Sequence, residues 1–180
     1  PNLVQYHDSY LDQPDRTNRM ILCIVMPLYT GGDLYKLLYS KFQRHEYLTE
    51  SELVWFGLNI AEGIKYLHDR SLIHRDLKPA NILLSTQGNN GFQVKIGDFG
   101  LAAQLQFDEE RKRTICGTPN YIAPEILLSS QEGHSYEVDV WSIGVILYTL
   151  VIGKPPFETS SIKTTYSKIK TASFSFPPHV

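Results

Sequence analysis

The sequence predicts an α+β fold in which a short β-rich part precedes a mainly helical part. Two runs near the start, 3–10 and 20–26, are rich in apolar and aromatic residues and flank a turn-rich link, which favours two adjacent strands. Later, a helical repeat over 49–69 and an almost wholly apolar run over 138–152 favour two helices. With 42% hydrophobic residues in a chain of 180, one sizeable core is expected.

A connector and a short helix are expected after the two strands. Pro27 has no backbone N–H to give to a helix or a sheet, and the pair Gly31-Gly32 would cost conformational entropy inside either. From 33 to 44, apolar residues recur at helical spacing. This pattern predicts a short amphipathic helix.

The middle of the chain predicts a long helix followed by a hairpin. Thr49 and Glu52 have the spacing of a capping box, in which each side chain bonds the backbone N–H of the other, so the long helix is expected to begin there. The apolar runs 82–84 and 92–96 flank the link 87–91, which is made of Gly, Asn and Gln. Such a link is typical of a hairpin turn, so the two runs are expected to pair.

The last third of the chain predicts a loop and a central helix. Residues 100–121 show no sustained hydrophobic period and are expected to form a mobile surface loop. Ser135 is expected to cap the helix over 138–152, which is apolar nearly all round and is therefore expected in the middle of the core. Gly153, with two prolines close behind it, is expected to end that helix.

The charges and the cysteines exclude several kinds of partner. The 17 basic and 19 acidic residues form no long run of one sign, so neither nucleic acid nor a membrane surface is expected as a partner. The run 138–152 is too short to cross a bilayer and contains Asp139. The 2 cysteines lack metal-site spacing, which favours a reducing compartment. Because the chain begins with Pro1 rather than Met, it is expected to be a piece of a longer protein.

Three short segments carry the chemistry. Residues 74–81 read His-Arg-Asp-Leu-Lys-Pro-Ala-Asn and bring a carboxylate, an ammonium and an amide close together. Residues 98–100 read Asp-Phe-Gly, in which a second carboxylate precedes a residue that bends freely, and residues 123–125 read Ala-Pro-Glu. Carboxylate and amide oxygens for metal ions, with a cation for the phosphate, are the groups that phosphoryl transfer requires.

On these segments, in this order, the chain resembles the eukaryotic Ser/Thr protein kinases over nearly its whole length. The resemblance implies a protein-kinase-like α+β fold that is truncated at both ends. Residues 1–29 would be part of the small lobe, with two strands and the hinge, and residues 30–180 part of the mainly helical large lobe. It also implies ATP and Mg²⁺ as cofactors and Ser or Thr hydroxyls of protein substrates as acceptors.

The resemblance assigns the reacting groups. Asp76 matches the catalytic base, which orients the acceptor hydroxyl, and Lys78 matches the lysine that stabilises charge on the transferred phosphate. Thr118 matches the threonine that bridges those two side chains in Ser/Thr kinases. Asn81 and Asp98 match the Mg²⁺ ligands. Taken singly, each of these residues has the alternative of a surface charge or a helix cap.

The resemblance also places the nucleotide. Met26 would be the gatekeeper and 27–29 the hinge, where adenine uses the C=O of Pro27 and the N–H of Tyr29. Asp33 is a candidate for binding the ribose hydroxyls. Leu83 is a candidate for the floor under adenine, with an ordinary core leucine as the equal alternative.

Regulation is expected in the loop over 100–121. Arg75 matches the arginine that pairs with a phosphorylated activation loop, and Thr114 is the candidate for the residue that an activating kinase phosphorylates. Glutamate in place of Thr114 is then expected to raise activity. The alternative is that the basic run 111–113 before it is only a solvated face.

Two further expectations concern buried polar residues. His74 and Phe99 are expected in the internal hydrophobic spine of the family together with Tyr6, so His74 is expected to be a packed histidine rather than an acid, a base or a metal ligand. Asp139 lies inside an apolar helix. It is expected to bond backbone near His74 and Arg75, because a buried carboxylate without donors is costly.

Within the kinases, the chain is similar to the polo-like kinases over the stretches 95–102, 114–125, 133–144 and 153–159. The hinge Gly31-Gly32-Asp33 is closer to the NIMA-related kinases, which remain the alternative subfamily. The likeness to polo kinases implies a cell-cycle role and a cytoplasmic location, with the nucleus, centrosome or spindle as further sites. Ala80 stands where basophilic kinases often place Glu, so no strong selection for arginine before the acceptor is expected.

Several parts of the family pattern do not occur in the chain. It has no Gly-rich loop, strand lysine or helix glutamate to clamp the ATP phosphates, and Glu125 lacks the arginine that pairs with it in the family. The isolated 180 residues are therefore expected to bind ATP weakly and to transfer phosphate poorly, while the parent protein is active. The rival class is a pseudokinase or scaffold that binds partners without catalysis.

Overall fold

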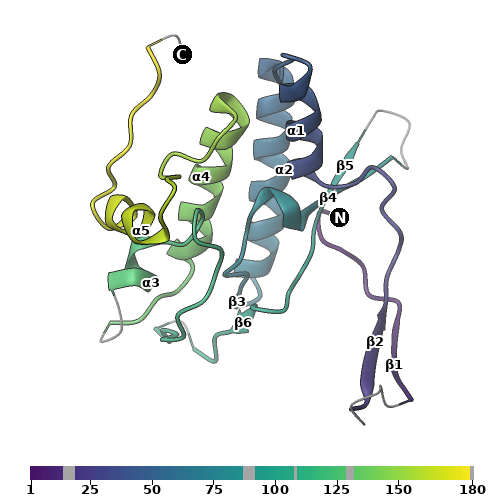
Figure 1. The fold of residues 1–180 in the computed structure, drawn as a ribbon. Helices are drawn as coiled ribbons and strands as arrows, with labels where there is room; N and C mark the ends of the chain where they lie inside the picture. The colour runs from purple at the N-terminus through teal and green to yellow at the C-terminus, as the bar shows by residue number, and fades with distance from the viewer. Residues whose placement is uncertain (14–18, 87–91, 108, 129–131, 179–180) are drawn as a thin grey trace.

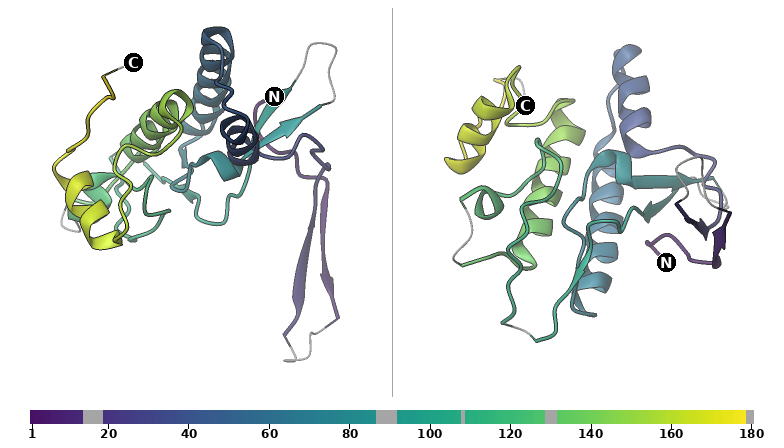
Figure 2. Two further views of the ribbon diagram at one scale, coloured as in Figure 1. Left: turned by 45° about the horizontal axis from the view of Figure 1, so that its top comes forward. Right: turned by 60° about the horizontal axis from the view of Figure 1, so that its bottom comes forward.

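A two-stranded hairpin projects from a body of helices, and a second hairpin lies against that body (Figures 1 and 2). The computed structural model describes residues 1–13, 19–86, 92–107, 109–128 and 132–178. The mixture of strands and helices confirms the predicted α+β class. In chain order the elements are β1 (Asp8–Asp12), β2 (Ile21–Val25), α1 (Leu34–Gln43), α2 (Glu50–His68), β3 (Leu72–Ile73), the 3₁₀ turn η1 (Pro79–Asn81), β4 (Ile82–Ser85), β5 (Gln93–Ile96), β6 (Ala103–Gln104), α3 (Pro124–Leu128), α4 (Glu137–Ile152) and α5 (Ile162–Lys170).

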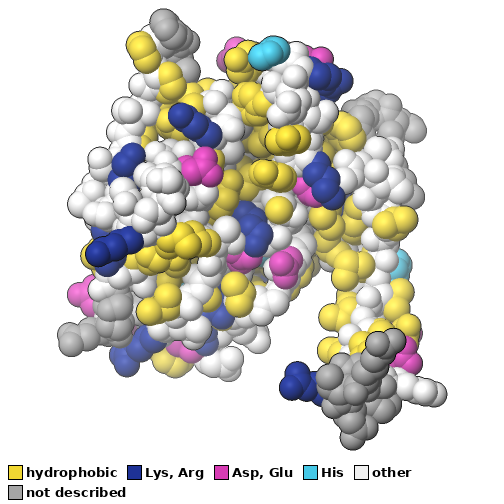
Figure 3. All heavy atoms as spheres, in the orientation of Figure 1, with side chains coloured by type: hydrophobic (Ala, Val, Ile, Leu, Met, Phe, Trp, Pro, Cys, Tyr) yellow, Lys and Arg dark blue, Asp and Glu magenta, His cyan; other side chains and the backbone are white. Residues whose placement is uncertain are grey.

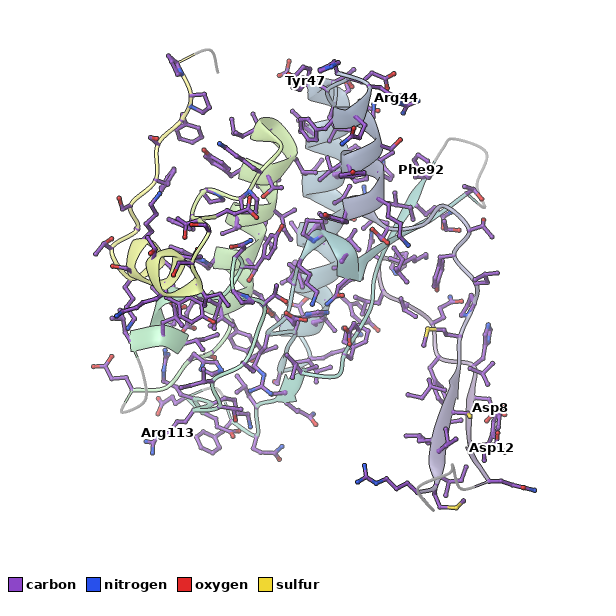
Figure 4. All side chains as sticks on the ribbon, viewed as in Figure 1. Asp8, Asp12, Arg44, Tyr47, Phe92 and Arg113 are labelled. Carbon is purple, nitrogen blue, oxygen red and sulfur yellow. The ribbon has the colours of Figure 1, made fainter. Side chains whose placement is uncertain are left out.

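The projecting hairpin consists of β1 and β2, which pair antiparallel from Asp8 opposite Val25 to Asp12 opposite Ile21. The prediction of two adjacent strands is therefore confirmed. Both strands expose most of their side chains, so hydrophobic groups lie on the surface of the hairpin (Figure 3). Asp8 and Asp12 lie along the β1 edge of the hairpin (Figure 4).

The first strand begins later than predicted, because residues 2–4 pair elsewhere. The N–H of Val4 donates to the C=O of Ile96 at 2.9 Å, and the N–H of Ile96 donates to the C=O of Asn2 at 2.8 Å. The side chain of Asn2 also donates to Asn59 on α2 at 2.7 Å. The start of the chain is thus attached to β5 and α2, and the prediction of a strand over 3–10 is wrong for its first half.

The second hairpin consists of β4 and β5 and confirms the predicted pairing, with Ile82 opposite Ile96 and Leu84 opposite Val94. These four side chains are buried against α1 and α2, together with the part of α4 that carries Ile146. The predicted link at 87–91 lies outside the described residues. The expected capping box is confirmed at the start of α2, where Thr49 and Glu52 bond each other's backbone N–H.

Helix α4 differs from its prediction at its start and on one side. The N-cap position is taken by Tyr136 and no side chain caps the helix, so the predicted cap at Ser135 is wrong. The N–H of Ser135 donates to the carboxylate of Glu137 at 3.1 Å. One side of α4 is buried as expected, whereas Val140 is 60% exposed and Val151 is 39% exposed. An all-round apolar pattern does not show which side of a helix other elements will cover.

The segment 100–121 contains more regular structure than predicted. β6 pairs antiparallel with β3, with Leu72 opposite Gln104. Further on, Lys112 and His134 exchange two N–H···O=C bonds of 2.8 Å. Strands of two residues are too short to produce a hydrophobic period, so the sequence pattern could not reveal them. No helix in the described ranges is long and apolar enough to cross a membrane.

Gly153 ends α4 as predicted, with a left-handed φ of 89°. A Cβ at this position would overlap the ring of Phe42 at the end of α1. Position 153 therefore requires glycine for two reasons, its backbone conformation and the close approach of α1.

The substitution Gly153→Ala is expected to lower the free energy of unfolding by about 2–4 kcal/mol, through left-handed strain and overpacking against Phe42. Urea unfolding measures this loss. The matched control is Gly32→Ala, because Gly32 also has a positive φ, 75°, but nothing lies within 4 Å of an added Cβ. The control is expected to lose only about 1 kcal/mol. Equal losses for the two variants would contradict the proposed overlap.

Candidate active site

Asp76, Lys78 and Thr118 form a closed triangle of hydrogen bonds. Lys78 Nζ donates to Asp76 Oδ2 at 2.6 Å and to Thr118 Oγ1 at 2.9 Å. Thr118 Oγ1 donates to Asp76 Oδ1 at 2.6 Å. The structure thus brings together three residues that the sequence analysis selected, although Thr118 lies on a separate segment of the chain. The three contacts fix a carboxylate beside an ammonium in a half-buried setting.

Asn81 lies on η1 and is also in contact with Asp76. Its Nδ2 donates to the backbone oxygen of Asp76 at 2.9 Å and to Asp76 Oδ2 at 3.3 Å. The donors of the amide group therefore face Asp76, which leaves the carbonyl oxygen as the end suited to a cation. The C=O of Asn81 accepts the N–H of Gly97 at 2.9 Å, so the residue before Asp98 is attached to the same turn.

Asp98 follows β5 and is exposed. Its φ is 62°, a left-handed conformation that is uncommon for a residue with a side chain and that recurs at functional sites. The N–H of Gly100 donates to Asp98 Oδ1 at 3.4 Å. This contact is long, so the carboxylate oxygens can still accept other bonds. In the part of the chain that the structure describes, no group of three or more His, Cys, Asp or Glu side chains could hold a metal ion. Asp98 is therefore not part of a cluster of such side chains within the described ranges.

Asp139 on α4 holds the backbone that precedes Asp76. Its fully buried carboxylate accepts the N–H of His74 at 2.9 Å and the N–H of Arg75 at 2.8 Å, as predicted. His68 Nε2, at the end of α2, lies 2.9 Å from the same carboxylate. His68 could not be selected from the sequence. A histidine in the last turn of a helix is common, because its positive charge interacts favourably with the helix dipole, so its presence there does not point to a buried partner.

His74 is a packed histidine, as predicted. Its ring meets Phe99 edge-on at 5.4 Å between centroids, and its Nε2 lies 3.0 Å from the C=O of Gly97. The expected third member of this group, Tyr6, is 65% exposed, and its hydroxyl bonds Ser9 at 2.8 Å. The prediction for Tyr6 is wrong, because residue 6 leads into the projecting hairpin rather than into the body.

The candidate nucleotide residues lie on the connector between β2 and α1 and on β4. Gly31 N–H donates to the C=O of Leu84, and the N–H of Leu84 donates to the C=O of Gly32, both at 2.9 Å. These bonds bring Asp33 opposite Leu83. Asp33 is the N-cap of α1, where its carboxylate accepts the N–H of Lys36 at 2.8 Å.

The remaining hinge candidates differ in exposure. Pro27 and Tyr29 are half-buried, and Met26 is exposed. The hydroxyl of Tyr29 accepts the N–H of Gln5 at 3.2 Å. This bond uses the side chain of Tyr29 and does not involve its backbone N–H. Leu83 is half-buried and lies beside Gly97 and Val4.

The two regulatory candidates are not brought into contact. Arg75 Nε donates to the C=O of Leu101 at 2.7 Å, and Thr114 is exposed. The basic run before Thr114 is partly engaged: Arg111 donates to the C=O of Gly133 at 3.0 Å and pairs with Glu137. Arg113 lies at the end of the molecule opposite to Arg44 and Tyr47 (Figure 4).

His134 anchors this same segment. It is 2% exposed, and its Nε2 has no partner among the described residues. Burial, followed by the charge of Arg75, lowers the pKa of His134; Arg111 acts in the same direction, whereas Glu137 and Asp139 oppose the shift. The folded protein therefore disfavours protonation of His134.

A groove beside the triangle was missed by the sequence analysis. It has a volume of about 580 Å³ and runs between α1, the loop at Lys78, the segment from Thr118 to Tyr121, and the residues after α4. Hydrophobic side chains gather on this face, between α4 and α1 (Figure 3). Burial raises the pKa of Tyr121, at the base of the groove, to about 12. The lining residues come from parts of the chain far apart in sequence, and no local pattern connects them.

Comparison with known sequences gives a consistent result. Residues 1–177 match the protein kinase domain family. A probable serine/threonine-protein kinase of Zea mays is 49% identical over 99% of this chain and 26% of its own length. The cell cycle serine/threonine-protein kinase CDC5/MSD2 of Saccharomyces cerevisiae is 49% identical over 98% of this chain and 23% of its own. The serine/threonine-protein kinase polo of Drosophila melanogaster is 45% identical over 100% of this chain and 28% of its own length. The chain thus spans about a quarter of the length of these relatives.

The lowered pKa of His134 predicts a pH dependence of stability. Between pH 7.5 and 5.5 the unfolded chain, with a histidine pKa of about 6.5, takes up a proton that folded His134 resists, so the free energy of unfolding is expected to fall as the pH is lowered. His134→Gln is expected to flatten this part of the profile in urea unfolding. His7→Gln, at an exposed site on the projecting segment, is the matched control. Identical pH profiles for the parent and His134→Gln would contradict the prediction.

Proposed function

The chain belongs to the protein kinase domain family, and on that premise we propose that the whole protein transfers the γ-phosphate of ATP to Ser and Thr hydroxyls of protein substrates. The triangle of Asp76, Lys78 and Thr118 is the observation that carries this proposal. It combines a group that can orient a hydroxyl with a cation that can face a phosphate. Similarity to serine/threonine-protein kinases over almost the whole chain supports it.

The proposed mechanism depends on orientation rather than on strong basicity. Asp76 accepts a hydrogen bond from the acceptor hydroxyl and directs its oxygen toward the phosphorus. The transition state of phosphoryl transfer is loose, so positioning of the nucleophile matters more than early removal of its proton. Lys78 stabilises the charge on the transferred group, and Thr118 holds both side chains in place.

The oxygen atoms of Asn81 and Asp98 fit a hard cation, because Mg²⁺ prefers carboxylate and carbonyl oxygens. The Nδ2 of Asn81 is already bonded to Asp76, and the carboxylate of Asp98 is exposed. We assign Mg²⁺ to these two residues. When bound, it offsets negative charge on the ATP phosphates.

For the nucleotide, we assign adenine to the hinge, where Pro27 offers its C=O and Tyr29 its N–H. Met26 borders this position, and Leu83 supplies apolar surface next to Gly97. Asp33 lies opposite Leu83 and is the candidate for the ribose hydroxyls, which it would bind while capping α1. We further propose the division into a small-lobe part, 1–29, and a large-lobe part, 30–180.

The similarity to polo and CDC5/MSD2 supports a role in the cell cycle, since the name of the yeast relative states one. We propose protein substrates as the partners, without nucleic acid or a membrane. We propose the cytoplasm as the place of action, together with the nucleus, centrosome or spindle.

Regulation is proposed at Thr114. It is exposed and follows the segment that Lys112 and His134 attach to the body. A phosphate on Thr114, added by an activating kinase, would carry a charge of about −1.5 to −2. This negative charge would attract the guanidinium groups of Arg75 and Arg111. The Nε of Arg75 donates to the C=O of Leu101, so pairing with the phosphate would use the Nη groups of its guanidinium.

Thr118→Val is expected to lower kcat by about 10- to 100-fold in the full-length protein, because valine has neither the donor for Asp76 nor the acceptor for Lys78. Transfer of radiolabelled phosphate from ATP to a protein substrate measures this change. Thr118→Ser keeps the hydroxyl and is the matched control, with most activity retained. Asp76→Asn provides the inactive baseline. Equal activity of the valine and serine variants would refute the role of the hydroxyl.

Thr114→Glu is expected to raise activity about two- to tenfold when the protein is otherwise unphosphorylated, because a negative charge at this position can pair with Arg75. Initial rates of phosphate transfer measure the gain. Thr164→Glu adds the same charge at an exposed position on α5 and should leave the rate unchanged. Addition of Arg75→Gln should abolish the gain, and a gain that survives this change would rule out the pairing.

A further inference from the structure

A charged side-chain contact joins the loop between β6 and α3 to the start of α4. Arg111 pairs with the carboxylate of Glu137, the first residue of α4, and also donates to the C=O of Gly133 at 3.0 Å. The neighbouring residues Lys112 and His134 exchange two backbone N–H···O=C bonds of 2.8 Å. The loop is thus held at this point both by its backbone and by an ion pair.

The loop lies very close to the residues that precede α4. A Cβ at position 133 would lie 2.8 Å from the backbone oxygen of Lys112 and 2.9 Å from the Cβ of Arg111, so only glycine allows this approach. The carboxylate of Glu137 also accepts the N–H of Ser135 at 3.1 Å, which fixes the acid beside Arg111. The fold therefore places Glu137 as the partner of Arg111.

This ion pair is weak enough to be replaced by a stronger one. The side chains of Arg111 and Glu137 are 41% and 42% exposed, and an exposed pair of this kind shifts an equilibrium by about fivefold at most. A phosphate on Thr114 would carry a charge of about −1.5 to −2 and three acceptor oxygens, whereas a carboxylate carries a single charge. Competition for the one guanidinium therefore favours the phosphate.

Arg111 also lies within reach of such a phosphate. It precedes Thr114 by three residues, which span at most about 11 Å even when fully extended. An arginine and a phosphothreonine side chain together can bridge that distance. Arg111 would thus offer the phosphate a second guanidinium in addition to that of Arg75.

We propose that Glu137 holds Arg111 while Thr114 is unphosphorylated, and that a phosphate on Thr114 takes Arg111 away from it. The proposal rests on the phosphorylation of Thr114 proposed above and names the contact on which that regulation acts. The change of partner would free the first residue of α4, two positions before Asp139, whose carboxylate holds the backbone before Asp76. The switch therefore lies next to the support of the candidate active site.

The test compares the full-length protein with its Glu137→Gln variant, each made with threonine or with phosphothreonine at position 114. Hydrogen exchange of the Lys112 and His134 amides measures how often the loop leaves α4. Glutamine still accepts the N–H of Ser135 but has no charge for Arg111, so hydrogen exchange in the unphosphorylated variant is expected to be about two- to fivefold faster than in the parent. With phosphothreonine, the parent and the variant are expected to have the same hydrogen-exchange rate.

The matched control is Glu132→Gln, which removes the same charge from an exposed side chain close by in the sequence and should leave hydrogen exchange unchanged. Salt at about 1 M should abolish the difference between the unphosphorylated parent and Glu137→Gln, because it screens an exposed ion pair.

The rate of phosphate transfer to a protein substrate is measured on the same samples, so that two kinds of failure can be told apart. If phosphothreonine at position 114 leaves this rate unchanged, the regulation proposed for Thr114 fails and this inference fails with it. If the rate rises but Glu137→Gln does not accelerate hydrogen exchange in the unphosphorylated protein, the inference alone is overturned. An acceleration of the same size with and without the phosphate also overturns it.

Discussion

The buried carboxylate of Asp139 connects the helical body to the loop that carries Asp76 and Lys78. It accepts the N–H groups of His74 and Arg75, the two residues before Asp76, and lies next to His68. A carboxylate in an apolar interior is tolerated only when donors surround it, so movement of the loop away from α4 would remove two of the donors that compensate this charge. Helix α4 therefore fills the core and also sets the position of the loop that carries Asp76.

From that loop, short contacts extend to the other side of the site. Asn81 bonds Asp76 through its side chain and Gly97 through its backbone, so the second carboxylate, Asp98, follows directly after an anchored residue. Thr118 reaches Asp76 from a third segment. Separate stretches of chain thus meet through hydrogen bonds to Asp76 and its neighbours. The buried side chains of β4 and β5 pack into the hydrophobic core next to these stretches.

Features decided by a few neighbouring residues were predictable from the sequence, and features decided across the fold were not. The capping box of α2 and the end of α4 at Gly153 depend on local conformation and were correct. The cap expected from Ser135 was wrong, because α4 begins at Glu137 and Tyr136 takes the N-cap position. Asp76, Lys78 and Thr118 were selected through motifs and the family resemblance, and the structure brings their side chains together. The groove was not, since α1 and the residues after α4 come together only in the folded chain.

Arg75 is held at a φ of 66°, between His74 and Asp76. Glycine adopts this conformation without steric cost, so glycine at position 75 relieves backbone strain while it removes the guanidinium. The proposed pairing of Arg75 with phosphorylated Thr114 would be lost with the guanidinium, so selection for heat resistance and selection for a response to phosphorylation would act on position 75 in opposite directions. On that proposal, a library ranked by melting temperature alone would be enriched in chains that are stable but do not respond to phosphorylation.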